Sequence, residues 1–350
     1  MLLQENIPLA PLTTFRIGGP AKFFVEVTSV REVEEAIAFA QSRSLPLFVL
    51  GGGSNLVVAD SGWPGLVIKV GIPGIDQRSA HEDGKAIFDV GAGESWDRFV
   101  SHAVMARCSG VECLSGIPGS VGGTPVQNVG AYGQEVSETI ASVLAYDRKD
   151  GQVRELCNEA CGFSYRGSIF NSTERGRFII LRATYALDPE GKPHITYADL
   201  KKQFEGRETP PNLAETREAV RHIRALKGML IVEGDADCQS AGSFFKNPVL
   251  SEEQHEELKR RAGTRGWTVP SYPALETRKK VSAAWLVERS GFTKGYGFEH
   301  VGISSKHALA IVNRGGATAA EVVALKDQIQ QRVEEIWGVR LEPEPVMVGF

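Results

Sequence analysis

The feature that most constrains the fold is a stretch without a single charged side chain, residues 113–134. This stretch is long enough to span a membrane. It holds six glycines and two prolines together with Ser, Thr, Gln and Asn, and this composition excludes a transmembrane helix. We therefore expect the backbone of this uncharged segment to be buried against other groups.

Length and composition indicate a soluble protein of two or three domains. The chain has 350 residues, of which 42% are hydrophobic and 23% are charged, and this balance excludes wholesale disorder. The net charge of -4 gives no basic field that would favour nucleic acid as the main partner. Residues 1–12 lack a secretory signal, and the five cysteines form no CxxC pair. We expect free thiols, no metal site, no membrane partner and a cytoplasmic location.

The first part of the chain alternates strand and helix patterns. Ser29 and Glu32 form a potential capping box that predicts a helix over 30–42, and apolar spacing predicts a second helix from Glu94. Asp150-Gly151 predicts a hairpin turn. Strands are predicted at 23–27, 45–50, 66–70, 87–91, 142–147, 152–156 and 178–187.

The composition changes at 188–212, which is rich in proline and charge and is predicted to be a linker. Beyond it, helices are predicted at 215–227, after Ser251, around 285–287 and after Thr318, and a strand at 308–313. Residues 341–350 are too short and too rich in proline to fold alone, so we expect them to pack on an earlier part of the chain.

Two glycine-rich loops could let backbone amides approach a phosphate. The first, 51–55, directly follows a predicted strand, and the second covers 116–123 and 127–133. Neither matches the GxGxxG or the GxxxxGK[ST] fingerprint, and either loop alone could be a pair of tight turns. Together they suit a long, pyrophosphate-bridged cofactor better than a mononucleotide.

Two polar side chains stand in unusual settings. Arg166 lies among aromatic and small residues, where an arginine could bind a carboxylate or a phosphate through two N–H groups, or could be an ordinary surface charge. Ser243 precedes Phe244 and Phe245, and on this stretch alone a serine that caps a turn explains the pattern equally well.

The motifs and their order resemble those of the UDP-N-acetylenolpyruvoylglucosamine reductases. They are TTFRIGGP at 13–20, GGGSN at 51–55, GIPGSVGG at 116–123, QNVGAYG at 127–133, FSYRGSIF at 163–170, AGSFFKNP at 241–248 and LEPE at 341–344. This family of flavoenzymes makes UDP-N-acetylmuramate for bacterial peptidoglycan, with NADPH as hydride donor and non-covalent FAD as cofactor. The resemblance covers essentially the whole chain.

The resemblance implies an α+β fold and a monomer. A two-lobed FAD-binding domain of the vanillyl-alcohol-oxidase (PCMH) type would be followed by an α/β substrate-binding domain. The implied boundaries are 1–70 for the first FAD-binding subdomain, with the tail 341–350 packed back on it, 71–205 for the second, and 214–340 for the substrate-binding domain.

The resemblance also implies functional residues. Arg166 matches the active-site arginine, Ser243 the proton donor and Glu344 a catalytic carboxylate. Tyr197 matches a substrate-positioning tyrosine, while Arg224 and Lys227, expected on one face of a helix end, and Asn247 match contacts to the UDP diphosphate. The implied FAD contacts are Gly51, Gly52, Gly53, Ser54, Asn55, Ile117, Pro118, Gly119, Ser120, Gly122, Gly123, Gln127, Asn128, Gly130, Ala131 and Tyr132.

These residue types suit the chemistry of the family. An enol ether conjugated to a carboxylate accepts hydride at its terminal carbon, and negative charge then develops on the carboxylate. Paired N–H donors from Arg166 can stabilise that charge. The resulting enolate carbon is basic enough for the Ser243 hydroxyl to act as its general acid. Glu344 is either protonated at that stage or holds Arg166 or a substrate hydroxyl.

Two alternatives belong to other classes. A flavin-dependent sugar or alcohol oxidase of the same fold would commonly tether FAD through histidine, yet none of the seven histidines lies in either glycine-rich loop. Cys108 and Cys113 leave a smaller opening for a thioether link. A non-catalytic nucleotide-sugar-binding relative is the second alternative, and the presence of Arg166, Ser243 and Glu344 argues against it.

Overall fold

A computed structural model describes residues 1–78, 84–274 and 277–350, and the chain divides into two compact units. The first unit comprises residues 1–7, 21–53 and 64–226, and the second comprises 8–20, 54–63 and 227–350. The chain therefore passes between the units several times. In the described ranges, no helix is both long and apolar enough to cross a membrane.

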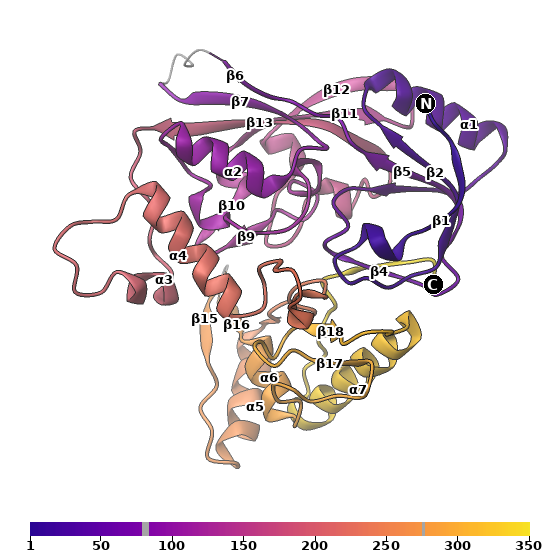
Figure 1. Cartoon of the computed structure of the whole chain (residues 1–350). Coiled ribbons are helices and arrows are strands. Elements are labelled where there is room, and N and C mark those ends of the chain that lie inside the picture. Colours follow the sequence, from indigo (N-terminus) through magenta and orange to yellow (C-terminus); the bar gives the residue numbers. More distant parts are fainter. Residues whose placement is uncertain (79–83, 275–276) are drawn as a thin grey trace. The chain divides into compact units, whose positions relative to one another are not determined.

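The first unit contains two principal sheets (Figure 1). The first sheet has the order β1-β2-β5-β3 and contains β1 (Gln4–Pro8), β2 (Pro20–Val27), β3 (Leu47–Leu50) and β5 (Trp63–Val70). The second has the order β12-β11-β13-β7-β6, with β8 paired to β13, and is formed by β6 (Ile75–Arg78), β7 (Ala86–Gly91), β8 (Cys108–Ser109), β11 (Ile140–Asp147), β12 (Gln152–Cys157) and β13 (Phe178–Pro189). The short hairpin of β9 (Gly130–Ala131) and β10 (Gln134–Glu135) completes its strands.

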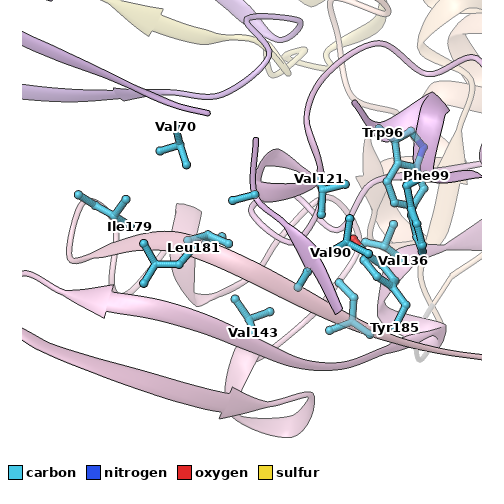
Figure 2. Close-up of a cluster of buried hydrophobic side chains, with 14 of the residues drawn as sticks. Val70, Val90, Trp96, Phe99, Val121, Val136, Val143, Ile179, Leu181 and Tyr185 are labelled. Carbon is cyan, nitrogen blue, oxygen red and sulfur yellow. The ribbon is translucent and has the colours of Figure 1, made fainter. Parts of the chain in front are cut away.

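Four α-helices belong to the first unit. They are α1 (Val30–Ser42), α2 (Trp96–Met105), α3 (Ala198–Gln203) and α4 (Leu213–Leu226). Trp96 and Phe99 of α2 are fully buried and pack with Tyr185 of β13, whose ring centroid lies 4.7 Å from that of Phe99. Figure 2 shows these rings beside the branched side chains of the sheet, including Val90 and Val143. This core fixes α2 and the loops that leave it.

The second unit is built from small sheets and three helices. Its strands are β4 (Leu56–Val58), β14 (Val249–Leu250), β15 (Ser271–Pro273), β16 (Lys279–Val281), β17 (Val301–Ile303), β18 (Ile311–Asn313) and β19 (Val346–Val348). Its helices are α5 (Glu252–Gly263), α6 (Ala283–Arg289) and α7 (Ala319–Trp337). β19 pairs in parallel with β4, which shows how the chain end 341–350 is held by a segment near the start of the chain.

Most of the predicted elements are present, and the capping signals explain their starts. Ser251 with Gln254 and Thr318 with Glu321 form complete capping boxes at α5 and α7. At α1 only half of the predicted box forms, because the Glu32 carboxylate accepts the N–H of Thr28 rather than that of Ser29.

Several predicted element bounds differ from those in the structure. The predicted linker 188–212 contains the helix α3, whose mostly polar sequence gave no periodic apolar pattern. The helix predicted to end at 227 ends at Leu226, and the strand predicted at 308–313 begins only at Ile311. The expectation of a buried uncharged segment is confirmed, since within 113–134 only Gly133 is exposed.

A buried carboxylate holds the end of the β11–β12–β13 sheet. Asp147 is fully buried, and its two oxygens accept bonds from Arg177 at 2.9 and 2.6 Å and from Arg154 at 3.1 Å. The Arg177 hydrogen bonds, against the opposing effect of burial, hold the pKa of Asp147 far below its ordinary value. The ionised form therefore stabilises the folded state.

We predict that Asp147→Asn lowers the melting temperature at neutral pH, because an amide cannot accept all of these bonds. Since the folded-state pKa of Asp147 is depressed, its stabilisation is complete above the unfolded pKa of about 3.9 and is lost as pH falls through the folded pKa. Thermal unfolding of both proteins between neutral and strongly acidic pH measures this. A gap between the two melting temperatures that does not narrow on acidification would contradict it.

Candidate functional site

Within the first unit, Gly51 and Gly52 of the first glycine-rich loop lie directly against Gly119 and Ser120 of the second. A Cβ placed on Gly52, which follows β3, would lie 2.5 Å from Gly119 Cα and 2.6 Å from Ser120 N. Real Cβ atoms essentially never come this close to backbone, so only glycine fits at position 52. A Cβ on Gly51 would similarly meet Ser120 Oγ at 2.9 Å. The sequence predicted both loops, and the structure brings them together.

The Ser120 hydroxyl lies at this junction and is buried, with no hydrogen-bond partner in the described parts of the chain. A buried hydroxyl without a partner is costly, unless a group absent from the protein itself completes its bonding. Gly53 and Gly119 both have positive φ, at +65° and +129°, which only glycine adopts readily. Glycine backbone and an available hydroxyl form a suitable cradle for a pyrophosphate.

An acidic residue that sequence reasoning missed anchors the second loop at Gly116. Asp97, in the first turn of α2, accepts the Gly116 N–H at 2.6 Å. Arg217 of α4 binds both oxygens of Asp97 at 2.6 and 2.9 Å, and Arg221 binds one at 2.9 Å. Burial opposes ionisation of Asp97, but these donors lower its pKa overall. The four-residue spacing of Arg217 and Arg221 was the signal that one carboxylate could engage both.

Arg224, predicted to contact a diphosphate, also helps to hold Gly116 in place. Its side chain is buried, and its Nε donates to the Gly116 carbonyl at 3.1 Å. Burial lowers its pKa, while Tyr132 and Asp97 act in the opposite direction. Lys227 directly follows the last residue of α4, at the boundary between the two units, and its contact with a diphosphate stays a prediction.

The Arg166 side chain contacts the loop 127–133. Arg166 itself occupies the tip of a tight turn closed by Ser164 and Gly167, with a φ of +55°. Its Nη2 donates to the Gly130 carbonyl at 2.8 Å, so the guanidinium is held over the loop. Asn128, with a φ of +45°, uses its side chain internally to bind Glu135, Ser164 and Ser137.

The other predicted cofactor residues follow the same two loops. Ile117, Pro118, Gly122, Gly123, Gln127, Ala131 and Tyr132 are partly buried in the first unit, and Ser54 and Asn55 are partly buried in the second.

Tyr197 begins α3 and is 45% exposed. Its ring packs edge-on against Tyr132 with centroids 5.4 Å apart and an interplanar angle of 84°. The structure therefore joins this predicted substrate residue to the second glycine-rich loop, although the two tyrosines are far apart in sequence.

In the second unit, backbone pairing brings Ser243 close to Glu344. Phe245 bridges Pro343, and the Glu344 N–H donates to the Phe244 carbonyl at 2.9 Å. Asn55 donates to the Glu344 carbonyl at 3.2 Å and fixes the same segment from another side. The Ser243 side chain is partly exposed and makes no hydrogen bond among the described residues. Its hydroxyl is thus available to a ligand.

Asn247, the remaining predicted substrate residue, has a structural bond as well. Its Oδ1 accepts the Ala283 N–H at 2.9 Å at the start of α6, and its amide N–H groups are the donors that could reach a ligand. This bond could not be predicted from the sequence, because the two residues are distant in the chain.

We predict that Gly52→Ala and Gly123→Val both lower FAD content, but for different reasons. The first substitution forces the two loops apart and should lower the melting temperature of the apoprotein. A Cβ at Gly123 meets only Ser120 Oγ, at 4.0 Å, so the second should fill cofactor space and leave apoprotein stability nearly unchanged. Flavin absorbance per protein and apoprotein melting temperature measure both effects.

Gly263→Val is the control, since a Cβ there meets nothing within 4 Å. This variant should keep its full flavin content. Full flavin occupancy in Gly123→Val would show that the cofactor does not use the space beside Ser120.

Comparisons with known proteins agree with this arrangement. Residues 21–156 match the FAD binding domain family, and residues 234–348 match the C-terminal domain of UDP-N-acetylenolpyruvoylglucosamine reductase. These matches confirm the predicted α+β fold with an FAD-binding part.

Similar full-length proteins carry one name. UDP-N-acetylenolpyruvoylglucosamine reductase of Thermobifida fusca is 45% identical over 99% of this chain and 98% of its own, and that of Streptomyces coelicolor is 45% identical over 99% and 90%. The crystal structure of the Thermus caldophilus enzyme has a TM-score of 0.68 at 27% identity and covers 99% of this chain and 100% of its own. The chain therefore belongs to the UDP-N-acetylenolpyruvoylglucosamine reductase family.

Proposed function

We propose that this protein reduces the enolpyruvyl ether of UDP-N-acetylglucosamine to UDP-N-acetylmuramate, with NADPH as reductant. The observation that supports this most is the backbone pairing of 243–247 with 342–344, which sets an available serine hydroxyl beside a carboxylate-bearing segment in a member of this family. The protein acts in the cytoplasm as a monomer, with no nucleic-acid or membrane partner. Its product serves peptidoglycan synthesis.

We assign residues 1–70 and 71–205 to the two FAD-binding subdomains, with the tail 341–350 completing the first, and 214–340 to the substrate-binding domain. The two glycine-rich loops would hold FAD without a covalent link, and the buried Ser120 hydroxyl would be available to donate to its pyrophosphate. Bound FAD would supply the hydride-transfer chemistry that links NADPH to the terminal carbon of the enol ether. The overall reaction consumes one proton and yields NADP⁺.

Arg166 stabilises the negative charge that develops on the substrate carboxylate. Its guanidinium is oriented by the bond from Nη2 to the Gly130 carbonyl and by the tight turn that carries it. A donor held in place before charge appears needs no reorganisation in the transition state, and each such contact contributes about 3 kcal/mol.

Ser243 donates the proton that the enolate carbon requires, and Glu344 acts with it. The partly exposed hydroxyl is not engaged by the described protein, and two buried phenylalanines follow it. These apolar neighbours restrict water, so that the proton comes from the serine rather than from solvent.

We assign Tyr197 to positioning of the UDP-sugar, and Arg224, Lys227 and the amide N–H groups of Asn247 to contacts with its diphosphate. Arg224 contributes positive charge while its Nε holds Gly116, so its loss would affect both the loop and the substrate. Tyr197 is exposed and already packed on Tyr132, which suits a residue that positions substrate.

We predict that Arg166→Ala lowers kcat by about 100-fold or more while NADPH still reduces the flavin at a near-normal rate. The charge that Arg166 stabilises appears only in the second half of the reaction. Stopped-flow absorbance separates the two half-reactions. Arg175→Ala is the control, because this surface arginine lies outside the proposed site. Equal losses in both half-reactions of Arg166→Ala would mean that the FAD site has collapsed.

Ser243→Ala should also keep its flavin and its reduction by NADPH, since removal of one oxygen leaves little void. The second half-reaction should slow by at least about 100-fold, the scale of lost general acid catalysis. Ser243→Cys should recover part of the loss, because a thiol also donates a proton. Turnover of Ser243→Ala near the normal rate, or failure through loss of substrate binding alone, would contradict the assignment.

A further inference from the structure

Glu112 is a fully buried carboxylate that the proposed reaction does not use. It lies in the 3-10 turn Glu112–Leu114 of the first unit, directly before the uncharged segment. Its Oε2 accepts the Gly110 N–H at 2.7 Å. Its Oε1 accepts both Gln134 Nε2 and the backbone N–H of His194, each at 2.9 Å. It forms no ion pair with any residue that the structure describes.

A buried negative charge without a cation is unfavourable unless several N–H donors compensate it. Three neutral donors from separate segments do so here. Glutamine could not replace the carboxylate, because one of its two terminal atoms is itself a donor and would face another N–H. Both terminal atoms of the side chain at position 112 must therefore accept hydrogen bonds, a requirement that packing alone would not impose.

The His194 bond joins this carboxylate to the segment that carries Tyr197. Cys113 Sγ contacts the His194 carbonyl at 3.4 Å, so both backbone groups of His194 are held. A Cβ on Gly133 would lie 2.2 Å from Thr196 Oγ1, which means that Thr196 packs directly on the Gly133 backbone. Tyr197 then rests edge-on against Tyr132.

Gln134 joins Glu112 to the other side of this contact. Its Nε2 binds Glu112, and its Oε1 accepts the Cys113 N–H at 2.8 Å, so the end of the second glycine-rich loop is fixed to the same point. Glu112 thus bonds both to Gln134 at the end of the second glycine-rich loop and to His194 in the segment that carries Tyr197.

We propose that Glu112 is a positioning residue that sets the affinity for the UDP-sugar by holding Tyr197 on the second glycine-rich loop. This inference rests on the proposed function, in which Tyr197 positions the UDP-sugar. It adds that this contact is preorganised in the free protein by a buried charge, and that Glu112 acts through Tyr197 rather than on substrate.

The test is Glu112→Gln, measured by steady-state kinetics and by hydrogen–deuterium exchange of the free protein. We expect the KM for the UDP-sugar to rise about 3- to 10-fold, the scale of one lost hydrogen bond, with a smaller change in kcat. Amides of 190–204 should exchange faster, while NADPH should reduce the flavin at the normal rate. Should Glu112→Gln not fold, Glu112→Asp is the substitute. It keeps the negative charge but moves the carboxylate away from its N–H donors, and it should also raise KM and speed the exchange of 190–204.

The matched control is Glu94→Gln. Glu94 is also a buried carboxylate of the first unit that accepts a backbone N–H, from Gly74 at 2.8 Å, but it has no bond to the Tyr197 segment. The Glu94→Gln variant should have a lower melting temperature but an unchanged KM for the UDP-sugar. An equal rise in KM in both variants, or a lower melting temperature in Glu112→Gln with unchanged KM and exchange, would overturn the positioning role.

Tyr197→Phe separates failure of this inference from failure of the proposed function. If Tyr197→Phe raises KM and Glu112→Gln does not, the substrate contact stands and the role of Glu112 is wrong. If neither raises KM although exchange of 190–204 increases in Glu112→Gln, Tyr197 is not a substrate contact and both assignments fail.

Discussion

The close contact of the Gly52 backbone with Gly119 and Ser120 is the constraint on which the functional architecture of the first unit depends. It joins the end of a strand in one sheet to a loop anchored beside the other. Because no side chain fits between them, the amides and the Ser120 hydroxyl can face a bound phosphate directly. A loop with any larger residue at position 52 would have to move away, and the cradle would open.

Buried or partly buried carboxylates hold several segments of the first unit in place. Asp97 fixes Gly116, Glu112 fixes the Tyr197 segment, and Asp147 fixes the far end of the large sheet. The uncharged segment 113–134 has no ionised side chain of its own to hold its conformation. Two carboxylates outside it accept its N–H groups: Asp97 accepts the Gly116 amide, and Glu112 accepts the Gln134 side chain. This explains how 113–134 can be buried and irregular at the same time.

Much of the fold could be predicted from sequence because its signals are local. The capping pairs at Ser251 and Thr318 marked α5 and α7 correctly, and strand alternation located β11, β12 and β13. The glycine motifs likewise indicated two tight loops, which the structure brings together. α3 was missed, since a six-residue helix in a charged segment has too few apolar positions to give a periodic pattern.

Long-range polar contacts could not be predicted. The bonds of Glu112 to His194 and of Asn247 to Ala283 connect residues whose spacing carries no sequence pattern. The family resemblance supplied Arg166, Ser243 and Glu344 as proposed catalytic residues. The most direct test of the proposed reaction is anaerobic reduction of the purified protein by NADPH, followed by addition of UDP-N-acetylglucosamine enolpyruvate. We predict stoichiometric recovery of oxidised flavin absorbance; recovery only after oxygen is admitted, or a colourless protein, would contradict the account.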